Sequence, residues 1–195
     1  EIGYGAGLLL FRLAPHCLQY HGTDLSEKVI TDLKANVAQA TNGCQITLAQ
    51  QSAEDFSGIE PETFDVVILN SVVQYFPTID YLMNVLDGAI KAVRPGGSIF
   101  IGDVRNLKLL EAFHASVQLH NAPSSLSVRD LRQRIQKQVQ EEKELVIDPG
   151  FFRELPKRFP EITAVEIQIK RGQYVNEVTS FRYDVILQIG GPARE

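Results

Sequence analysis

The chain has 195 residues and a formal net charge of −5, and 44% of its residues are hydrophobic while 22% are charged. This size and composition predict one folded domain with its own core and exclude an intrinsically disordered chain. The negative charge argues against a protein that binds nucleic acid by neutralising phosphates, so we expect no nucleic-acid partner.

The chain opens on a glycine turn. The pair Glu1-Ile2 is followed by glycine at every second position, Gly3, Gly5 and Gly7, and then by apolar residues. Glycines let the backbone turn tightly and approach a ligand because they carry no Cβ. A short helix, predicted over 8–14, would offer free N–H groups directly after the turn. A strand should lead into such a turn, so we expect that the first strand is truncated and that the chain is a piece of a longer polypeptide.

Strands and helices alternate through the first half of the chain. A strand is predicted over 20–24, and Ser26 is a good N-cap for the helix after it, whose apolar residues recur every fourth position. Another strand is predicted over 44–48. The continuous apolar run 64–70 is typical of a strand buried on both faces of a parallel sheet.

The second half continues this alternation and then departs from it. A one-sided apolar helix over 78–93 precedes a buried strand over 98–103. The sequence predicts three further helices, the middle one highly charged, over 106–119, 129–142 and 151–159. Two alternating strands, 162–170 and 181–189, have no helix between them, and we expect them to pair as an antiparallel hairpin at one sheet edge.

This order of elements predicts an α/β fold, a mostly parallel sheet with right-handed crossovers and helices on both faces. Ligands bind such sheets at the carboxyl ends of the strands. The glycine turn, Asp24, Asn70 and Asp103 all fall at such ends.

Asp24 narrows the kind of ligand. It closes the strand about twenty residues after the glycines, where an adenosine ribose is held by its hydroxyls. A carboxylate suits a diol because it accepts two hydrogen bonds that its charge strengthens. No Lys-Ser or Lys-Thr pair follows the glycines, which argues against a triphosphate loop, and their alternate spacing departs from the dinucleotide fingerprint.

The run Glu1–Gly7 resembles motif I of the class I S-adenosylmethionine-dependent methyltransferases. The resemblance continues through Asp24, the adenine-edge loop 52–55, the strand 64–67 and Pro95–Gly97. It implies a Rossmann-like fold, S-adenosylmethionine as cofactor, and a wall of the methionine pocket at Asn70. The implied cofactor-binding residues are Glu1, Gly3, Gly5, Gly7, Asp24, Ser52, Ala53 and Asn70.

A narrower resemblance extends over nearly the whole chain, to the methyltransferase domains embedded in nonribosomal peptide synthetases. Such domains methylate the α-amine of an aminoacyl group that a phosphopantetheine arm holds as a thioester on a carrier protein. The resemblance therefore implies N-methylation, with adenylation and peptidyl-carrier domains of the same polypeptide as partners. It rests on the runs Asn70–Pro77, Gly102–Arg105, Leu110–His114, Glu144–Pro149, Lys170–Glu177 and Phe181–Asp184.

Three positions depart from the family pattern. Motif I more often has Cys and Thr or Ser where this chain has Tyr4 and Ala6, which leaves the affinity for the cofactor open. An acid is common at the adenine edge where Ser52 stands, so either Asp55 or backbone and packing would hold the adenine.

Methyl transfer requires mainly alignment and exclusion of water, but the accepting amine must be neutral. A general base is therefore useful, and His114 is the first candidate, with Glu177 and Tyr75 behind it. Each also has a plain structural interpretation, such as a partly buried histidine at His114 or core packing at Tyr75.

Three further residues are predicted at the rim where substrate enters, namely Gln74, Asp103 and Arg105. Asp103 and Arg105 have the alternative of pairing with each other. The charged helix 129–142 is either a solvated face or a contact for a lid or carrier protein.

We expect a single methyltransferase domain over 1–190. Three alternatives stay open, namely a stand-alone small-molecule methyltransferase, a C-methyltransferase of a hybrid assembly line, and a non-catalytic insert. The two cysteines stand at no metal-ligand spacing and no apolar run reaches the ~20 residues that span a bilayer, so we expect no metal, no membrane and a cytoplasmic setting. The expected parts of the chain are a cofactor-binding half (1–104), a helical lid or substrate region (105–160), an edge hairpin (161–190) and a tail (191–195).

Overall fold

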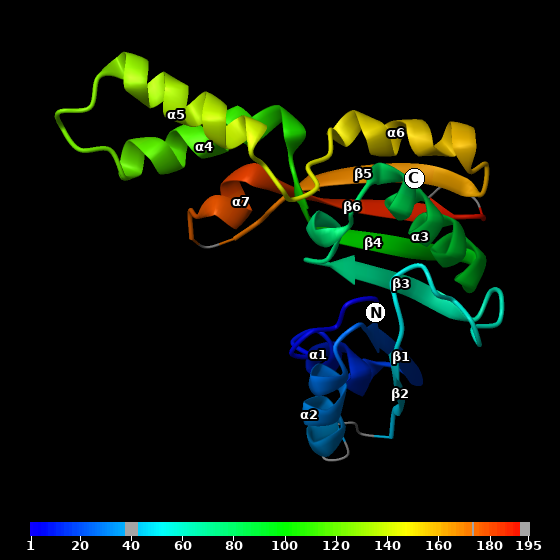
Figure 1. Ribbon diagram of the computed structural model, residues 1–195. Coiled ribbons are helices and arrows are strands. Elements are labelled where there is room, and N and C mark those ends of the chain that lie inside the picture. Colours follow the sequence, from blue (N-terminus) through cyan, green and yellow to red (C-terminus); the bar gives the residue numbers. More distant parts are fainter. Residues whose placement is uncertain (38–42, 173, 192–195) are drawn as a thin grey trace.

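The structure, a computed structural model, describes residues 1–37, 43–172 and 174–191 (Figure 1). Its strands form two groups, a parallel pair β1-β2 and a four-stranded group in the order β3-β4-β6-β5. The strands are β1 (Gln19–Asp24), β2 (Gln45–Gln50), β3 (Phe64–Asn70), β4 (Val93–Arg105), β5 (Ile162–Ile169) and β6 (Arg182–Ile189).

Ile2 joins the two groups of strands. It forms parallel bridges to Thr23 of β1 and to Leu69 of β3, and its N–H donates to the carbonyl of Ile68 at 2.8 Å. β3 and β4 are parallel, whereas β6 runs antiparallel to both β4 and β5. The predicted mostly parallel sheet with an antiparallel edge hairpin is confirmed.

Helices cover both faces of this sheet. Leu69 of β3 shares a core cluster with residues of α3 and α6, whereas Tyr20 of β1 packs with Leu10 of α1. Ile2 bridges both Thr23 and Leu69, so the side chains of these two residues are on the same face of the sheet. Tyr20 lies three residues before Thr23 in β1, and side chains alternate along a strand, so Tyr20 and its cluster are on the opposite face. The helices are α1 (Leu10–Leu13), α2 (Glu27–Val37), α3 (Ile79–Ala92), α4 (Leu110–His120), α5 (Val128–Gln140), α6 (Pro149–Arg158) and α7 (Glu177–Phe181).

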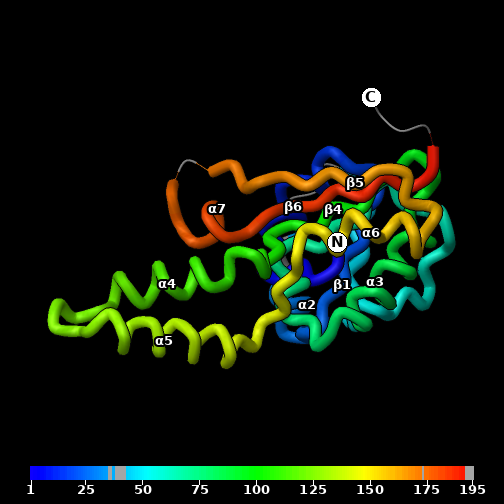
Figure 2. Tube along the Cα trace, turned by 90° about the horizontal axis from the view of Figure 1, so that it is seen from above, coloured from blue at the N-terminus to red at the C-terminus, as the bar shows by residue number. Residues whose placement is uncertain are grey.

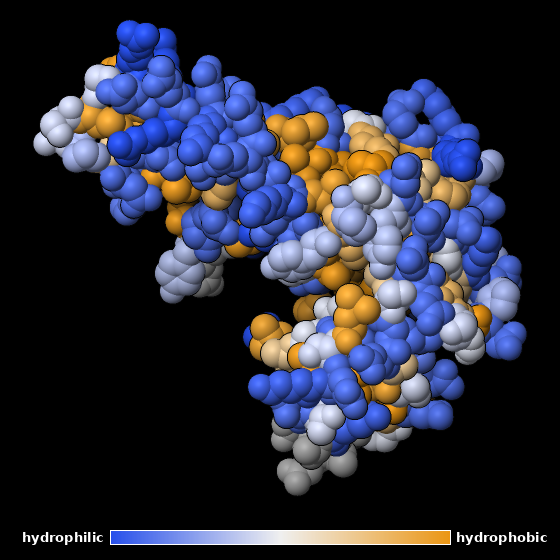
Figure 3. Space-filling model, in the orientation of Figure 1, coloured by the Kyte–Doolittle hydropathy of each residue, from blue (hydrophilic) through white to orange (hydrophobic). Residues whose placement is uncertain are grey.

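α4 and α5 form a hairpin that projects from the sheet beyond the carboxyl ends of β3 and β4 (Figures 1 and 2). The two ends of this hairpin are joined at the sheet, because Asn106 forms a β-bridge with Ile147 and the Ile147 N–H donates to the Arg105 carbonyl at 2.9 Å. Ser127 caps α5, and its hydroxyl accepts the Asp130 N–H at 3.1 Å. The outer surface of the hairpin is mostly hydrophilic, and the molecule is hollowed between it and the part formed by α1 and α2 (Figure 3).

Several boundaries differ from the sequence-based expectations. β4 begins at Val93 and not at residue 98, because the glycine segment also runs along β3 as part of the strand. The two strands are so close here that a Cβ on Gly97 would lie 2.5 Å from the Asp65 carbonyl oxygen. α7 was not expected; a capping box between Asn176 and Thr179 starts it. α6 packs on the sheet core and is not part of the projecting hairpin. Residues 192–195 of the expected tail lie outside the described residues.

Short 3-10 turns complete the description, at Ala14–His16, Val73–Tyr75 and Leu107–Leu109. Among the described residues, no helix is both long and apolar enough to cross a membrane.

Candidate functional site

The three glycines of the opening turn all have left-handed backbone, with φ of +74° at Gly3, +49° at Gly5 and +76° at Gly7. A Cβ on Gly3 would lie 2.8 Å from the Val72 side chain, and one on Gly7 would lie 2.7 Å from that of Leu33. A Cβ on Gly5 would meet no atom within 4 Å. Gly3 and Gly7 therefore allow close packing, whereas Gly5 faces open space that a ligand can occupy.

Asp24, the last residue of β1, holds this turn. One carboxylate oxygen accepts the Gly5 N–H at 3.0 Å, and the other accepts the Ser26 N–H at 2.9 Å. A carboxylate has about four lone-pair positions, so each oxygen keeps one for a further donor. Asp24 can therefore fix the turn and still accept two hydroxyls of a ribose, and the open side of Gly5 lies beside it.

Two other residues of the opening run, Glu1 and Tyr4, have contacts of their own. The Glu1 carboxylate accepts the Tyr20 hydroxyl at 2.5 Å and lines a cavity of about 630 Å³ between β1 and β3, where burial raises the pKa of Glu1. Tyr4 is 3% exposed and packs with Ile30 and Leu33, and burial raises its pKa to about 12. The bulk of Tyr4 is thus accommodated by packing against α2.

The expected adenine-edge residues form a turn after β2. The Ser52 carbonyl accepts the Asp55 N–H at 3.1 Å, and Ala53 packs against the core cluster that includes α3. Asp55, the alternative acid, accepts the Ser57 N–H at 2.9 Å, and its hydrogen bonds with Ser57 lower its pKa.

The carboxyl ends of β3 and β4 carry a strained cluster. Ser71 (φ +56°) and Asp103 (φ +61°) are both left-handed without being glycine, and the Ser71 hydroxyl donates to the Asp103 carboxylate. A Cβ added to Gly102 would lie 2.1 Å from the side-chain oxygen of Asn70. The Asn70 side chain therefore fits at this place because residue 102 is glycine. Backbone strain of this kind concentrates at functional sites, which is consistent with the expected role of Asn70 in a ligand pocket.

Lys170 anchors this cluster from the edge hairpin. Its ammonium lies 2.7 Å from the Asp103 carboxylate and 3.0 Å from that of Asp184, which also accepts the Asp103 N–H at 2.9 Å. Burial disfavours the charge on Asp103, but hydrogen bonds from Lys170 and Ser71 outweigh it and lower the pKa of Asp103. The alternative that Asp103 pairs with Arg105 is therefore wrong.

Replacing Lys170 with methionine should destabilise the fold by about 2 kcal/mol, because two largely buried carboxylates lose their shared cation. The contribution of ionised Asp103 to the free energy of unfolding is present above its ordinary pKa of 3.8 and is lost as pH falls through the lowered pKa. The difference in stability between Lys170→Met and the unaltered protein should therefore shrink in acid. Urea denaturation at neutral and acid pH measures both effects. Lys157→Met, which removes an exposed ion pair with Glu154, is the control and should cost under about 0.5 kcal/mol; equal losses in both variants would contradict the anchoring role.

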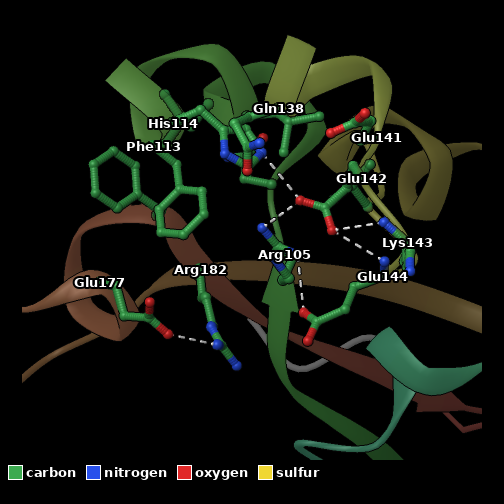
Figure 4. Close-up of a pocket in the computed structure, with 15 residues that line it drawn as sticks. Arg105, Phe113, His114, Gln138, Glu141, Glu142, Lys143, Glu144, Glu177 and Arg182 are labelled. Atoms are coloured by element: carbon green, nitrogen blue, oxygen red, sulfur yellow. Dashed lines mark hydrogen bonds and ion pairs between the residues drawn. The ribbon is translucent and has the colours of Figure 1, made fainter. Parts of the chain in front are cut away.

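A second region, a pocket of about 430 Å³, lies between α4, the segment after α5, and α7 (Figure 4). Three predicted site residues come together here, His114 from α4, Arg105 from the end of β4 and Glu177 from α7. Phe113 and Phe181, whose rings meet edge to face at 5.5 Å, give it an apolar wall. The pocket thus combines an aromatic wall with titratable groups, as ligand sites usually do.

Glu142 is the centre of this pocket, and sequence reasoning missed it. Its Oε2 accepts from Arg105 at 2.9 Å and lies 3.2 Å from His114 Nε2. Arg105 also donates to Glu144 at 2.9 Å and lies 5.1 Å over the Phe113 ring. Burial raises the pKa of Glu142, but the Arg105 and backbone hydrogen bonds outweigh it and lower that pKa. In the run Glu141–Glu144, no spacing distinguishes one acid from the next.

The remaining candidates are divided between surface and core. Tyr75 is 70% exposed and does not line the pocket. Gln74, expected at the rim, is 4% exposed, and its carbonyl accepts the Leu145 N–H at 2.8 Å. Glu177 is exposed and forms an ion pair at 2.9 Å with Arg182, whose side chain is largely buried. The Gln74 bond joins the strained cluster at the end of β3 to the segment that carries Glu142.

Known proteins resemble this chain along nearly its whole length. A family model described as "Methyltransferase domain" matches residues 1–99. Chondramide synthase cmdD from Chondromyces crocatus is 53% identical over 191 residues, which make up 98% of this chain and 5% of the synthase. Nonribosomal peptide synthetase TES from Alternaria alternata is 37% identical over 192 residues, 96% of this chain and 4% of that protein. The chain thus spans a small part of these relatives.

Among solved structures, the N-methyltransferase NodS from Bradyrhizobium japonicum WM9, in complex with S-adenosyl-l-homocysteine, matches with a TM-score of 0.58. The match covers 97% of this chain and 76% of NodS at 18% identity. At that identity the likeness concerns the fold.

Proposed function

This chain belongs to the family of methyltransferase domains, and on that premise we propose that it N-methylates a carrier-bound aminoacyl thioester within a nonribosomal peptide synthetase. The similarity to a segment inside such synthetases, over nearly the full length of this chain, is the observation that carries the proposal. The turn of Gly5 and Asp24 and the pocket walled by Phe113 and Phe181 offer places for the two reactants, and this supports the proposal.

S-adenosylmethionine is the cofactor in this proposal, and when bound it supplies a methyl group already activated by a sulfonium. Asp24 accepts the ribose hydroxyls, the open side of Gly5 lets the ligand approach the backbone, and Asn70 borders the methionine part. The complex of NodS with S-adenosyl-l-homocysteine supports this assignment.

Gly5→Ala should weaken S-adenosylmethionine binding about tenfold, because the new methyl enters the open space beside Asp24. The left-handed φ of +49° adds a cost to folding of roughly 1 kcal/mol. Gly7→Ala is the matched comparison, since its methyl meets Leu33 at 2.7 Å and should mainly destabilise the fold. Calorimetric titration and urea denaturation of both variants separate the two effects, and unaltered affinity in Gly5→Ala would argue against this face of the turn.

The acceptor in this proposal is an α-amine that enters the aromatic pocket. His114 is the general base, because it is buried on the pocket wall and Glu142 orients its ring. Glu177 is a weaker candidate since Arg182 occupies its carboxylate, and Tyr75 is weaker because it lies outside the pocket. Exclusion of water by Phe113 and Phe181 and alignment of the amine are the other contributions of the chain.

The acceptor is tested by offering the protein an aminoacyl thioester on a carrier domain, the corresponding free amino acid, and S-adenosylmethionine labelled in its methyl group. We expect label on the α-nitrogen of the tethered substrate and little on the free amino acid. Label on a carbon atom would favour C-methylation, preference for the free amino acid would favour a stand-alone enzyme, and absence of cofactor binding would favour a non-catalytic insert.

A further inference from the structure

α5 is a cationic helix on an acidic protein. It carries four cationic side chains and one anionic side chain, a net charge of +3, whereas the whole chain has a net charge of −5. The four cationic residues are all exposed and are Arg129, Arg132, Arg134 and Lys137. Because α5 belongs to the hairpin that projects from the sheet (Figure 1), a partner molecule can approach these charges from several sides.

Three of these cations have no partner among the described residues. Lys137 lies 3.8 Å from the Glu141 carboxylate. In the part of the chain that the structure describes, no ion pair or hydrogen bond engages the guanidinium groups of Arg129, Arg132 and Arg134. A guanidinium is always charged and offers five donors in a planar fork that fits phosphate and carboxylate groups. The helix therefore has donors available for an anionic partner.

The placement of these arginines is unfavourable for the helix itself. Arg129 is the second residue of α5, and Arg132 lies about one turn further on. The N-terminal end of a helix carries a partial positive charge, so cations in its first turns oppose helix formation. Side chains three residues apart are neighbours on a helix, so the two guanidinium groups also repel each other. The stability of α5 therefore does not explain this pair, whereas binding of an anionic partner does.

Apolar side chains are exposed at the same end of the hairpin. Leu119, near the end of α4, is 60% exposed, and Val128, the first residue of α5, is 68% exposed. The loop between the two helices, residues 121–127, contains no charged side chain. Arginine is enriched at protein–protein interfaces and lysine is depleted there, so this composition favours a protein partner. The hairpin surface is defined here by Leu119, Val128, Arg129, Arg132 and Arg134.

The hairpin surface is continuous with the aromatic pocket along α5. Gln138 lines that pocket, and Arg134 lies one helical turn before Gln138 on the same side of the helix. At a rise of about 1.5 Å per residue, Arg129 lies about 14 Å from Gln138 along the helix axis. A substrate held on a long arm can therefore reach the pocket while its carrier stays at the hairpin surface.

We propose that the hairpin surface docks the carrier domain, at the face of that domain from which the phosphopantetheine arm extends. The arm is attached through a phosphate that keeps a negative charge, so this face of the carrier is anionic. Arg129 and Arg132 pair with the anionic face, and Leu119 and Val128 pack against the carrier beside it. The inference rests on the proposed function in one respect, the delivery of the substrate on a carrier domain.

Two substrates that differ only in the carrier test this surface. The variant Arg129→Gln/Arg132→Gln is compared with the unaltered protein on an aminoacyl thioester of a carrier domain and on the same thioester of pantetheine alone. We expect the KM for the carrier-bound substrate to rise about tenfold and to lose most of its dependence on salt concentration. The KM for the pantetheine thioester, the kcat with either substrate and the affinity for S-adenosylmethionine should stay unchanged.

The matched control is Arg153→Gln/Arg158→Gln, which removes the same charge from two exposed arginines of α6. It should leave both KM values unchanged. Urea denaturation should show that Arg129→Gln/Arg132→Gln is at least as stable as the unaltered protein, since two unfavourable cations leave the first turns of α5. An equal rise of KM with both thioesters, or an unchanged KM with the carrier-bound one, would overturn the docking surface.

Binding without turnover separates this inference from the proposed function. Calorimetric titration with a carrier domain that bears the arm but no aminoacyl group should give a Kd about tenfold larger for Arg129→Gln/Arg132→Gln. If the unaltered protein binds this carrier but transfers no methyl group to the amine, only the proposed function is overturned. Methyl transfer to the amine with the same Kd in both proteins overturns only the docking surface. If the variant instead loses self-association in sedimentation, with its carrier affinity unchanged, a second copy of this chain occupies the surface and the inference is wrong.

Discussion

Replacing His114 with alanine is expected to lower kcat for methyl transfer by about 10²- to 10³-fold, the usual contribution of a positioned general base. His114 is 8% exposed, lines the aromatic pocket and contacts Glu142 at 3.2 Å. Since the pocket is separate from the glycine turn, affinity for S-adenosylmethionine should change little. Single-turnover rates with a tethered aminoacyl substrate and calorimetric titration with the cofactor measure the two quantities.

The matched control is His120→Ala, because His120 is exposed at the end of the same helix and lies outside the pocket. It should retain the rate of the unaltered protein. Raising the pH should partly restore the rate of His114→Ala, since a larger share of the amine is then neutral without a base. If His114→Ala and His120→Ala transfer methyl equally fast, the base lies elsewhere.

Replacing Asp24 with alanine is expected to weaken S-adenosylmethionine binding about 100-fold, or about 2.7 kcal/mol, because the ribose loses a charged acceptor. The variant should also lose about 1 kcal/mol of stability, since Gly5 and Ser26 lose the acceptor of their N–H groups. Calorimetric titration and urea denaturation measure both. The expected order is that affinity falls far more than stability.

Asp24→Asn serves as the graded comparison, because the amide keeps one accepting oxygen and loses the charge. It should bind the cofactor with an affinity between those of the unaltered protein and Asp24→Ala. Glu154→Ala, which removes an exposed acid on α6, should leave the affinity unchanged. A normal affinity in Asp24→Ala would remove the basis for a ribose contact at the end of β1.

The sheet and the glycine turn could be predicted because their determinants are local. Apolar runs, the Asp24 position and the glycine spacing lie within short stretches, and strands such as 64–70 appear where the pattern indicates them. The distinction among the glycines could not be predicted, since Gly7 meets Leu33 and Gly3 meets Val72 across the fold. Local sequence identified the turn, and tertiary packing decides which glycine faces the open space.

The aromatic pocket was predictable only in part. His114, Arg105 and Glu177 were candidates by residue type, and the structure brings them together. Glu142 was not a candidate, because it lies in an acidic run at the end of a charged helix, and its importance comes from a contact with a residue 28 positions away. The same holds for Lys170, whose carboxylate partners are on other strands.

The joined ends of the α4–α5 hairpin have a consequence for how the sequences of such domains can vary. Because Asn106 and Ile147 meet at the sheet, the segment between them can change in length and sequence while the register of β3, β4 and β6 is kept. His114 and Glu142 belong to this segment, whereas Arg105 and the glycine turn belong to the sheet. Under the proposed function, exchanging residues 106–147 between homologous domains would change the acceptor and keep the methyl donor.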